Sequence, residues 1–397
     1  MGAGPVGMLT ALGLAERGVR VHIVDRYRRT ALHSYALALH PGTLRLLDEF
    51  GIAETLVERG QRLDCIDIYS GEQPRATIEL APLGGSFPFV LVVPQALLES
   101  AIEQRLADSG IQVFWNHPVL MFENETDTLS VLLAEVPDDR AGDDDSIPSD
   151  VSTTRVQPSY LVGADGYGSL ARRLLSTPLQ ESGESMVYGL VEFETTIEKP
   201  DRMTLVFGED STDVLWPMGS GRGRWGVQLD KDAHGIDSAG VWDIVARRAP
   251  WFQSTACRTE WSDCVSFRSR LVRSYGQGRV WLAGDAAHCS PPAGVQSMNV
   301  GMREGYDLAR RLAAILRDGG SPKLLRYYHE DREREWKMLL GFHDRLRRLP
   351  EARSWAVELG QRLVGALPAS GHDLNLLLEQ VGLRLRWLRR KSRSSLD

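Results

Sequence analysis

Three short segments of the chain combine glycine with a carboxylate at spacings that suit a nucleotide ligand. The first, residues 2–7 (GAGPVG), is a G-x-G-x-x-G pattern that leads into a helical stretch and is followed, after an apolar run, by Asp25. Glycine at Gly2, Gly4 and Gly7 permits a tight turn and lets a pyrophosphate approach the helix N-terminus, while the acidic residue can hold a ribose. The alternative is a glycine-rich turn without a ligand, which the helix, the strand and Asp25 disfavour.

The second segment covers residues 160–172 (YLVGADGYGSLAR), in which Asp165 and Gly166 follow a short apolar run. A strand closed by an ordinary Asp-Gly turn is the simple interpretation. That interpretation leaves Ser169 and Arg172 unexplained, so a role for this segment at a ligand stays open.

The third segment is residues 284–299 (GDAAHCSPPAGVQSMN), which follows the apolar run 279–283 and precedes a helical stretch. Asp285 is therefore expected at the carboxyl end of a strand, with free backbone amides at the following helix start. Such a place suits the polar tail of a ligand and a ring that gains negative charge.

The elements that must position these segments alternate between helix and strand. Apolar, β-branched runs predict strands over 19–25, 111–115, 160–163 and 280–283, and helical patterns cover 8–17 and 95–109. This alternation predicts a parallel sheet. Residues 65–93 and 186–273 instead show aromatic residues, alternating patterns and turn signals, which indicate a mainly antiparallel sheet. From residue 304 onward the pattern is helical.

We therefore predict an α/β protein with a discontinuous, Rossmann-like nucleotide-binding domain, an inserted antiparallel substrate-binding sheet and a helical C-terminus. The corresponding ranges are 1–64, 94–185 and 274–345 for the first, 65–93 and 186–273 for the second, and 346–397 for the third. Residues 137–158 are acidic and rich in Ser, Thr and Asp, so they are predicted to form a surface loop.

Composition excludes several classes of protein. A chain of 397 residues with 43% apolar residues can bury two or three packed units, and its net charge of −7 argues against nucleic-acid binding. Cys65, Cys257, Cys264 and Cys289 form no C-x-x-C pair, which predicts neither a metal site nor disulfides. The unpaired cysteines fit a reduced cytoplasm, and the charge favours small molecules as partners. Because no run approaches the roughly 20 apolar residues of a membrane span, we expect a soluble protein. A monomer and a homodimer are both expected to be possible.

In this order and spacing, the three segments resemble the class A flavoprotein monooxygenases of the para-hydroxybenzoate hydroxylase family, over scattered blocks of residues 1–337. The resemblance implies that the glycine loop and Asp25 hold the ADP part of FAD and that Gly284 and Asp285 hold the ribitol. It assigns cofactor binding to Gly2, Gly4, Gly7, Asp25, Gln95, Asp165, Gly166, Ser169, Arg172, Gly284, Asp285, Pro292, Gly294, Met298 and Asn299. Of these, Gln95 and residues 292–299 are implied to contact the flavin ring, and residues 165–172 to serve FAD and the nicotinamide cofactor.

The implied reaction is hydroxylation of an aromatic substrate, phenolic or polyketide-like. NADPH or NADH would reduce the flavin, dioxygen would add at C4a, and the hydroperoxide would deliver one oxygen atom to the ring. A flavin halogenase is disfavoured because no W-x-W-x-I-P segment occurs. A flavin-dependent reductase and a non-catalytic member of the fold remain alternatives, and no catalytic residue is assigned.

Four positions depart from the family pattern. Ser297 and Val295 replace small residues and predict a tighter loop beside the flavin, Tyr35 stands where many members have arginine, and Glu304 replaces a frequent aspartate. His288 is expected to have a structural or ring-proximal role.

Two further expectations concern the substrate pocket and the start of the chain. The pocket is expected between the antiparallel sheet and residues 291–299, with candidate wall residues Tyr188, Phe193, Phe207, Trp216 and Met218. In folds of this type an apolar strand precedes the glycine loop, whereas here Met1 directly precedes Gly2. We therefore expect that upstream residues are lacking from this sequence, and that a short apolar run would precede Gly2.

Overall fold

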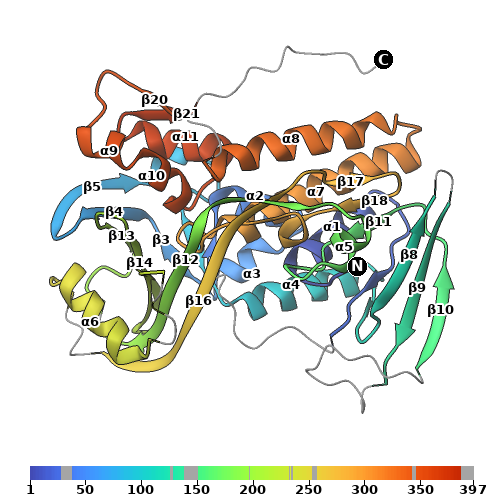
Figure 1. Ribbon diagram of the computed structural model, residues 1–397, viewed down its shortest axis with the longest axis horizontal. Coiled ribbons are helices and arrows are strands. Elements are labelled where there is room, and N and C mark those ends of the chain that lie inside the picture. The colour runs from blue at the N-terminus through green and yellow to red at the C-terminus, as the bar shows by residue number, and fades with distance from the viewer. Residues whose placement is uncertain are drawn as a thin grey trace.

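The protein is described by a computed structural model, which places helices and sheets in distinct layers (Figure 1). The structure describes residues 1–27, 38–125, 128–137, 151–195, 197–231, 233, 236–252, 257–341 and 346–385. It confirms the predicted α/β class, with parallel strands beside an antiparallel sheet.

The nucleotide-binding part contains short parallel strands that form two separate sheets. In one, β1 (Ile23–Val24) pairs with β7 (Val113–Phe114); in the other, β11 (Leu161–Gly163) pairs with β18 (Val280–Leu282), which β17 (Gly276–Gln277) extends. The predicted strands are confirmed, although β1 covers only two residues of the run 19–25.

Four helices pack together next to these strands. Helix α1 (Pro5–Ala15) packs against α4 (Gln95–Asp108) and α7 (Gln296–Arg317), and α8 (Lys323–Leu339) lies along α7 (Figure 1). The contact between α1 and α7 is close because a Cβ atom built on Gly305 would come within 2.2 Å of Thr10 Oγ1. Glycine at this position therefore fixes the two helices at short distance.

The second layer is a large sheet in the order β19-β16-β12-β15-β14-β13-β4-β5. Its pairs are antiparallel except β13 with β4, which are parallel. The strands are β4 (Cys65–Ser70), β5 (Gln73–Glu79), β12 (Leu179–Glu194), β13 (Arg202–Phe207), β14 (Thr212–Gly219), β15 (Arg222–Leu229), β16 (Arg258–Val272) and β19 (His288–Cys289).

The large sheet is covered on both faces. Helix α6 (Ser238–Arg248) packs on one face with Val187, Val191 and Phe193 of β12. On the other face, Phe207 and Trp216 belong to the same apolar cluster as residues of α9 (Ser354–Glu358), α10 (Gly360–Ala366) and α11 (Gly371–Glu379). The C-terminal helices thus lie over the sheet face that is turned toward the nucleotide-binding part (Figure 1).

Smaller elements complete the chain. One three-stranded sheet joins β2 (Ala38–Leu39), β6 (Val90–Val92) and β3 (Gln61–Leu63), next to α2 (Pro41–Asp48) and α3 (Ala53–Val57). Strands β20 (Leu346–Arg348) and β21 (Leu383–Leu385) pair beside α11, and η1 (Ala81–Leu83), α5 (Leu170–Leu174) and η3 (Gly284–Ala286) are single turns. Among the described residues, no helix has the length and apolar character needed to cross a membrane.

A further sheet, formed by β8 (Val119–Asn124), β9 (Leu129–Glu135) and β10 (Ser152–Val156), corrects the prediction of a loop over 137–158. Residues 152–156 pair in register with β9, because their backbone groups complete its open edge although their side chains are exposed. Residues 138–150 lie outside the described part of the chain.

Candidate cofactor site

The glycine loop turns sharply into α1 and places the amino end of this helix at the edge of both parallel sheets. The amide of Gly2 donates to Val24 O at 2.9 Å, and the amide of Ala164 donates to Met1 O at 2.9 Å. Gly4 is the N-cap of α1 and supplies no side-chain cap, so the first amides of the helix point outward as an anion-binding group would require.

The three glycines of the loop are required for different reasons. A Cβ atom on Gly7 would lie 1.9 Å from Gly2 O, and one on Gly2 would lie 2.2 Å from Ala164 O. Packing alone therefore explains these two. A Cβ atom on Gly4 would meet nothing within 4 Å, so protein packing does not require glycine there. Close approach of a ligand is the remaining physical reason for glycine at this position.

Asp25 lies directly after β1 and braces the loop. Its Oδ2 accepts a hydrogen bond from Ala3 N at 2.6 Å, and its Oδ1 accepts one from Tyr27 N at 2.9 Å. Each carboxylate oxygen can accept further hydrogen bonds. The acidic residue therefore stands beside the helix start, where the sequence placed it.

The second segment forms a tight turn that ends in α5. Asp165 Oδ1 accepts from Ser169 Oγ at 2.6 Å, its Oδ2 accepts from Ala171 N at 3.1 Å, and Ser169 Oγ in turn accepts from Arg172 N at 3.0 Å. Asp165 and Ser169 thus cap this short helix. Gly166 adopts a φ of +72° in the turn and has open space where a side chain would project.

Arg172 connects the second segment to the third. Its guanidinium donates to Ala286 O at 3.0 Å and to Tyr167 O at 2.8 Å, and burial lowers the pKa of this group. This side chain therefore links the two turns that carry Asp165 and Asp285, in addition to the backbone pairing of the strands before them.

The Gly-Asp turn of the third segment lies against the start of α1. Gly284 has a φ of +64°, and a Cβ atom on it would lie 3.0 Å from Val6 Cγ2. The next residue, Asp285, is exposed to solvent and makes no side-chain hydrogen bond or ion pair with the described residues. The surrounding protein limits its hydration and thereby raises the pKa of its carboxyl, while His288 opposes this rise and Glu304 adds to it. Such an accessible, unpaired carboxylate is suited to accept hydrogen bonds from a ligand.

Residues 290–299 run from this turn into α7. Asn299 is buried, and its Nδ2 donates to Ala38 O and Val295 O while its Oδ1 accepts from His40 N at 2.8 Å. Both donors of the Asn299 side chain and one acceptor site of its oxygen are thus used inside the protein, which disfavours a side-chain contact with flavin. Gly294 O contacts His40 Nε2 at 2.8 Å, and burial lowers the His40 pKa to about 3, which keeps this imidazole neutral.

The C-terminal helices cover the same loop. A Cβ atom on Gly294 would lie 2.4 Å from Gly365 O, and the buried Gln296 donates from Nε2 to Leu367 O at 2.7 Å and to Ala369 O at 2.9 Å. Pro292 accepts from Val295 N at 3.0 Å, and the partly buried Met298 packs toward α1 and α4. These contacts tie the loop to residues 365–369, which the sequence did not indicate.

Two positions that depart from the family pattern explain the shape of this loop. Ser297 Oγ accepts from Ser290 N at 2.9 Å and lies 3.0 Å from Ser290 Oγ, so the hydroxyl closes the loop on itself. Val295, the N-cap of α7, adopts a φ of +48°, which is unfavourable for a β-branched residue. The third departure, Tyr35, lies outside the described residues.

Replacing Ser297 by glycine is expected to loosen this loop without unfolding the protein. Loss of the two hydrogen bonds should destabilise the protein by about 1 kcal/mol and alter the absorption spectrum of bound flavin. Visible spectra and urea unfolding of the variant provide the measurement, and Ser238→Gly, on the distant helix α6, is the control. An unchanged flavin spectrum would remove Ser297 from the site.

The remaining flavin-contacting candidate, Gln95, begins α4 directly after Pro94. Its Nε2 donates to Glu99 Oε1 at 2.7 Å along the same helix. The structure thus places Gln95 at a helix start next to the core that contains Met298, and its contact with flavin stays a prediction.

Behind the Gly-Asp turn lies a buried polar network around Glu304. Its Oε2 accepts from Gly284 N at 3.2 Å and contacts His288 Nε2 at 2.6 Å, while its Oε1 accepts from Trp336 Nε1 at 2.6 Å. The His288 ring stacks on Trp336 with 3.8 Å between ring centres, and both residues are fully buried. His288 therefore supports the turn from behind, consistent with a structural role.

We expect Glu304→Gln to destabilise the protein by about 2–4 kcal/mol. The reason is geometric: Gly284 N and Trp336 Nε1 can only donate, and they face opposite oxygens of Glu304. A glutamine NH₂ must oppose one of these donors in either orientation. Chemical denaturation measures the effect, with the exposed Glu330→Gln on α8 as control. Equal stability of the two variants would show that the network does not hold the turn.

The predicted pocket walls divide between the two faces of the large sheet. Phe193 packs against Trp242 and Phe252 on the α6 side, so its prediction as a wall residue is wrong. Strand alternation turns Tyr188 to the opposite face, where Phe207, Trp216 and Met218 belong to the cluster shared with the C-terminal helices. These four remain candidates.

The site therefore consists of a glycine turn at a helix start, three carboxylates at the ends of parallel strands and a loop under the C-terminal helices. This arrangement is typical of a dinucleotide-binding site. Residues 1–342 match the model of the family described as FAD binding domain. The chain belongs to this family, and FAD is its cofactor.

Curated relatives agree with this assignment. The chain is 28% identical over 338 residues to the uncharacterized aromatic compound monooxygenase YhjG of Bacillus subtilis, a match that covers 84% of this chain and 64% of YhjG. It is 30% identical to 6-methylpretetramide 4-monooxygenase of Streptomyces rimosus, with 83% of this chain and 58% of the relative covered. The chain thus spans about three fifths of the length of these relatives.

Solved structures share the fold. The p-nitrophenol 4-monooxygenase PnpA from Pseudomonas putida DLL-E4 superposes with a TM-score of 0.74 at 21% identity and covers 96% of this chain and 95% of its own. Aklavinone-11 hydroxylase, solved with FAD and aklavinone, gives a TM-score of 0.70 at 22% identity, covering 95% of this chain and 71% of its own.

Proposed function

We propose that the protein is an FAD-dependent monooxygenase that hydroxylates an aromatic substrate, using NADPH or NADH and dioxygen. The observation that supports this best is the exposed carboxylate of Asp285, which has no side-chain hydrogen bond or ion pair with the described residues and lies beside a glycine turn whose Gly4 is free of packing constraint. The names of the relatives favour an aromatic substrate, because they include an aromatic compound monooxygenase, 6-methylpretetramide 4-monooxygenase and pentachlorophenol 4-monooxygenase.

The residues of the site fit FAD. We assign the pyrophosphate to the amides around Gly4 and α1, the adenosine ribose to Asp25, and the ribitol to Asp285. The backbone of residues 292–299 would lie along the flavin ring, where the amides at the start of α7 favour negative charge on the ring. Bound FAD supplies electron transfer from the nicotinamide cofactor and activation of dioxygen.

The chain's own task is to position the substrate and exclude water. The large sheet offers apolar side chains on the face that carries Trp216 and Phe207, and the C-terminal helices close over that face through Gln296 and residues 365–369. An aromatic ring held there would be shielded from solvent, which favours oxygen transfer over loss of the activated oxygen.

The test is NADPH and NADH oxidation by the FAD-loaded protein across a panel of phenols and polycyclic aromatic compounds. We expect one class of compound to stimulate oxidation and to gain one oxygen atom by mass. Product formation that does not need dioxygen would instead identify a reductase. Absence of bound flavin and of turnover would favour a non-catalytic member of the fold.

Arg172 is the proposed contact for the nicotinamide cofactor. Its hydrogen bonds to Ala286 O and Tyr167 O give the alternative that it only braces the two turns. We expect Arg172→Ala to slow flavin reduction by NADPH about tenfold, because one charge-assisted contact to the reductant is lost. Flavin content should fall less. Stopped-flow reduction and flavin-to-protein ratios are compared with the exposed Arg247→Ala on α6. An equal loss of both properties would show that Arg172 only braces the two turns.

A further inference from the structure

The backbone at Val295 adopts a conformation that this type of residue disfavours. Val295 is the N-cap of α7, is buried, and has a φ of +48° and a ψ of +40°. The left-handed region is strained for a β-branched side chain, and such strain persists only where the surrounding structure holds it in place. Contacts from the rest of the protein must therefore fix the two peptide groups that flank this residue.

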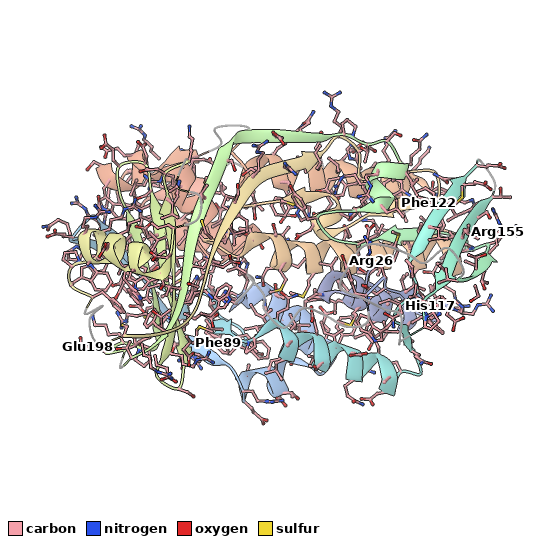
Figure 2. All side chains as sticks on the ribbon, turned by 60° about the horizontal axis from the view of Figure 1, so that its bottom comes forward. Arg26, Phe89, His117, Phe122, Arg155 and Glu198 are labelled. Carbon is pink, nitrogen blue, oxygen red and sulfur yellow. The ribbon has the colours of Figure 1, made fainter. Side chains whose placement is uncertain are left out.

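Three hydrogen bonds fix these two peptide groups. The carbonyl of Gly294 accepts from His40 Nε2 at 2.8 Å, and the amide of Val295 donates to Pro292 O at 3.0 Å. The carbonyl of Val295 accepts from Asn299 Nδ2 at 2.9 Å. Of the three partners, His40 alone comes from another part of the chain, since it is the N-cap of α2. Figure 2 shows the blue N-terminal helices, which include α2, beside the orange helix α7.

The peptide between Gly294 and Val295 is the group that can turn over. Rotation of this peptide plane by about 180° changes only ψ of the first residue and φ of the second, and glycine accepts a wide range of ψ. The rotation would take φ of Val295 from +48° to about −130°, which is extended backbone that suits a β-branched residue. It would also break the hydrogen bonds to His40 Nε2 and Pro292 O. The observed orientation therefore depends on these two bonds.

His40 is suited to hold the carbonyl of Gly294 in one direction. The residue is 1% exposed, and because a carbonyl oxygen can only accept, Nε2 carries the proton. Its own amide donates to Asn299 Oδ1 at 2.8 Å, while Nδ1 has no hydrogen-bond partner among the described residues. Burial lowers the pKa of the imidazole to about 3, the bond to Gly294 opposes this effect, and the charge of Arg303 adds to it. The ring is therefore neutral near neutral pH and keeps a single donor.

The orientation of this peptide matters for the start of α7. The first amides of a helix have no acceptor within the helix, and no side chain caps those of α7. A flip at residues 294–295 would change the direction in which the chain enters α7. It would thereby displace the amides that the proposed function places along the flavin ring.

We propose that His40 is a positioning residue for the flavin ring. Its hydrogen bond to Gly294 O keeps the strained peptide before Val295 from turning over, and so keeps the first amides of α7 directed at the ring. The inference rests on the proposed function, in which the backbone of residues 292–299 lies along the flavin. His40 acts only through the backbone of this loop and takes no part in the reaction itself.

The test combines two substitutions of His40 with one of Val295. Glutamine carries an NH₂ group near the position of Nε2 and can keep the bond to Gly294 O. Asparagine is one carbon shorter and carries its NH₂ group near the position of Nδ1, which has no partner among the described residues. Val295→Gly removes the side chain that disfavours a positive φ. His372→Gln, at an exposed position on α11, is the control.

Three properties are measured for each single variant and for the combined ones. Hydrogen exchange of the amide at position 295, in the protein without FAD, reports whether the bond to Pro292 O is intact. Equilibrium titration gives the affinity for FAD, and the absorption spectrum of bound flavin reports on the surroundings of the ring.

We expect His40→Asn to speed this exchange at least tenfold, to weaken FAD binding about tenfold and to shift the flavin spectrum. His40→Gln should keep both values within about threefold of the parent protein. In the Val295→Gly protein, His40→Asn should change both values by less than about threefold, because glycine adopts a positive φ without penalty and the peptide gains nothing by turning.

Two results would overturn the proposal. Equal effects of glutamine and asparagine would show that the imidazole ring fills space and that its Nε2 bond is not needed. An effect of His40→Asn that is the same in the Val295→Gly protein would show that the two residues act independently. A parent protein that binds no FAD would refute the proposed function instead, and exchange without FAD would still decide whether His40 holds the peptide.

Discussion

Gly4→Ala is expected to abolish FAD retention while leaving the thermal midpoint within about 2 °C of the parent protein. An added methyl group meets no protein atom within 4 Å, and the φ of −72° at this residue suits alanine. The fold therefore has no reason to change. If the pyrophosphate of FAD lies against this backbone, the methyl group separates the ligand from the helix amides and removes their hydrogen bonds.

Gly7→Ala is the matched variant, because the same methyl group is added one turn further along. Its Cβ would lie 1.9 Å from Gly2 O, so the backbone must move, and we expect destabilisation of about 1–3 kcal/mol in addition to loss of FAD. Flavin-to-protein ratio and urea unfolding are measured for both variants. Full flavin content in Gly4→Ala would place the pyrophosphate elsewhere, and equal unfolding of both variants would contradict the packing argument.

The local parts of this site could be predicted from the sequence. Helices α1 and α4 follow from short stretches rich in helix-forming residues such as alanine and leucine, and the Gly-Asp turn follows a short buried strand. Asp285 was expected at the carboxyl end of a strand, and the structure places it there. Asp25 and Asp165 also follow strands, and parallel strands direct their carboxyl ends to one edge. The contacts of Gly2 with Ala164 and of Gly284 with Val6 show that the turns lie together.

The parts that depend on distant pairing could not be predicted. Gly284 N and Trp336 Nε1 both donate to the carboxylate of Glu304. Gly284 precedes α7, Glu304 lies on α7 and Trp336 lies on α8, so no local pattern in the sequence reveals this shared contact. The C-terminal helices cover residues 290–299 through contacts that are equally distant in the sequence. Gln296 Nε2 donates to the carbonyls of Leu367 and Ala369, which lie 71 and 73 residues further along the chain.

Strand faces were also ambiguous. A shift of one residue turns every side chain of a strand to the other face, so Phe193 was assigned to the substrate side although it packs on α6. Strand β10 was missed because its side chains are all exposed and its neighbours in sequence are acidic, whereas its stability comes from backbone pairing with β9. Amino-acid composition reflects the properties of side chains and does not predict an edge strand that is held by backbone hydrogen bonds alone.

Asp285→Ala is expected to weaken FAD binding by roughly 5-fold to 150-fold, which corresponds to about 1–3 kcal/mol for one lost carboxylate contact. The carboxylate makes no hydrogen bond or ion pair with the described residues, so its removal breaks no internal contact that the structure shows. We therefore expect the stability of the protein without FAD to stay the same. Stability in the presence of excess FAD should fall, because a ligand stabilises the folded state in proportion to its affinity.

Asp285→Asn separates charge from hydrogen bonding at the same position, since the amide keeps one acceptor oxygen and should recover part of the affinity. Asp243→Ala, at an exposed position on α6, is the control for the loss of a surface carboxylate. Equilibrium titration with FAD gives the affinities, and thermal unfolding with and without FAD shows how far FAD stabilises each variant.

A wild-type affinity in Asp285→Ala would remove this residue from the site, and the lack of a partner for its carboxylate among the described residues would then have no explanation. A lower stability without FAD would mean that the carboxylate supports the turn itself. In that case the loss of flavin would follow from the turn, and the ribitol contact would have to be assigned to another residue.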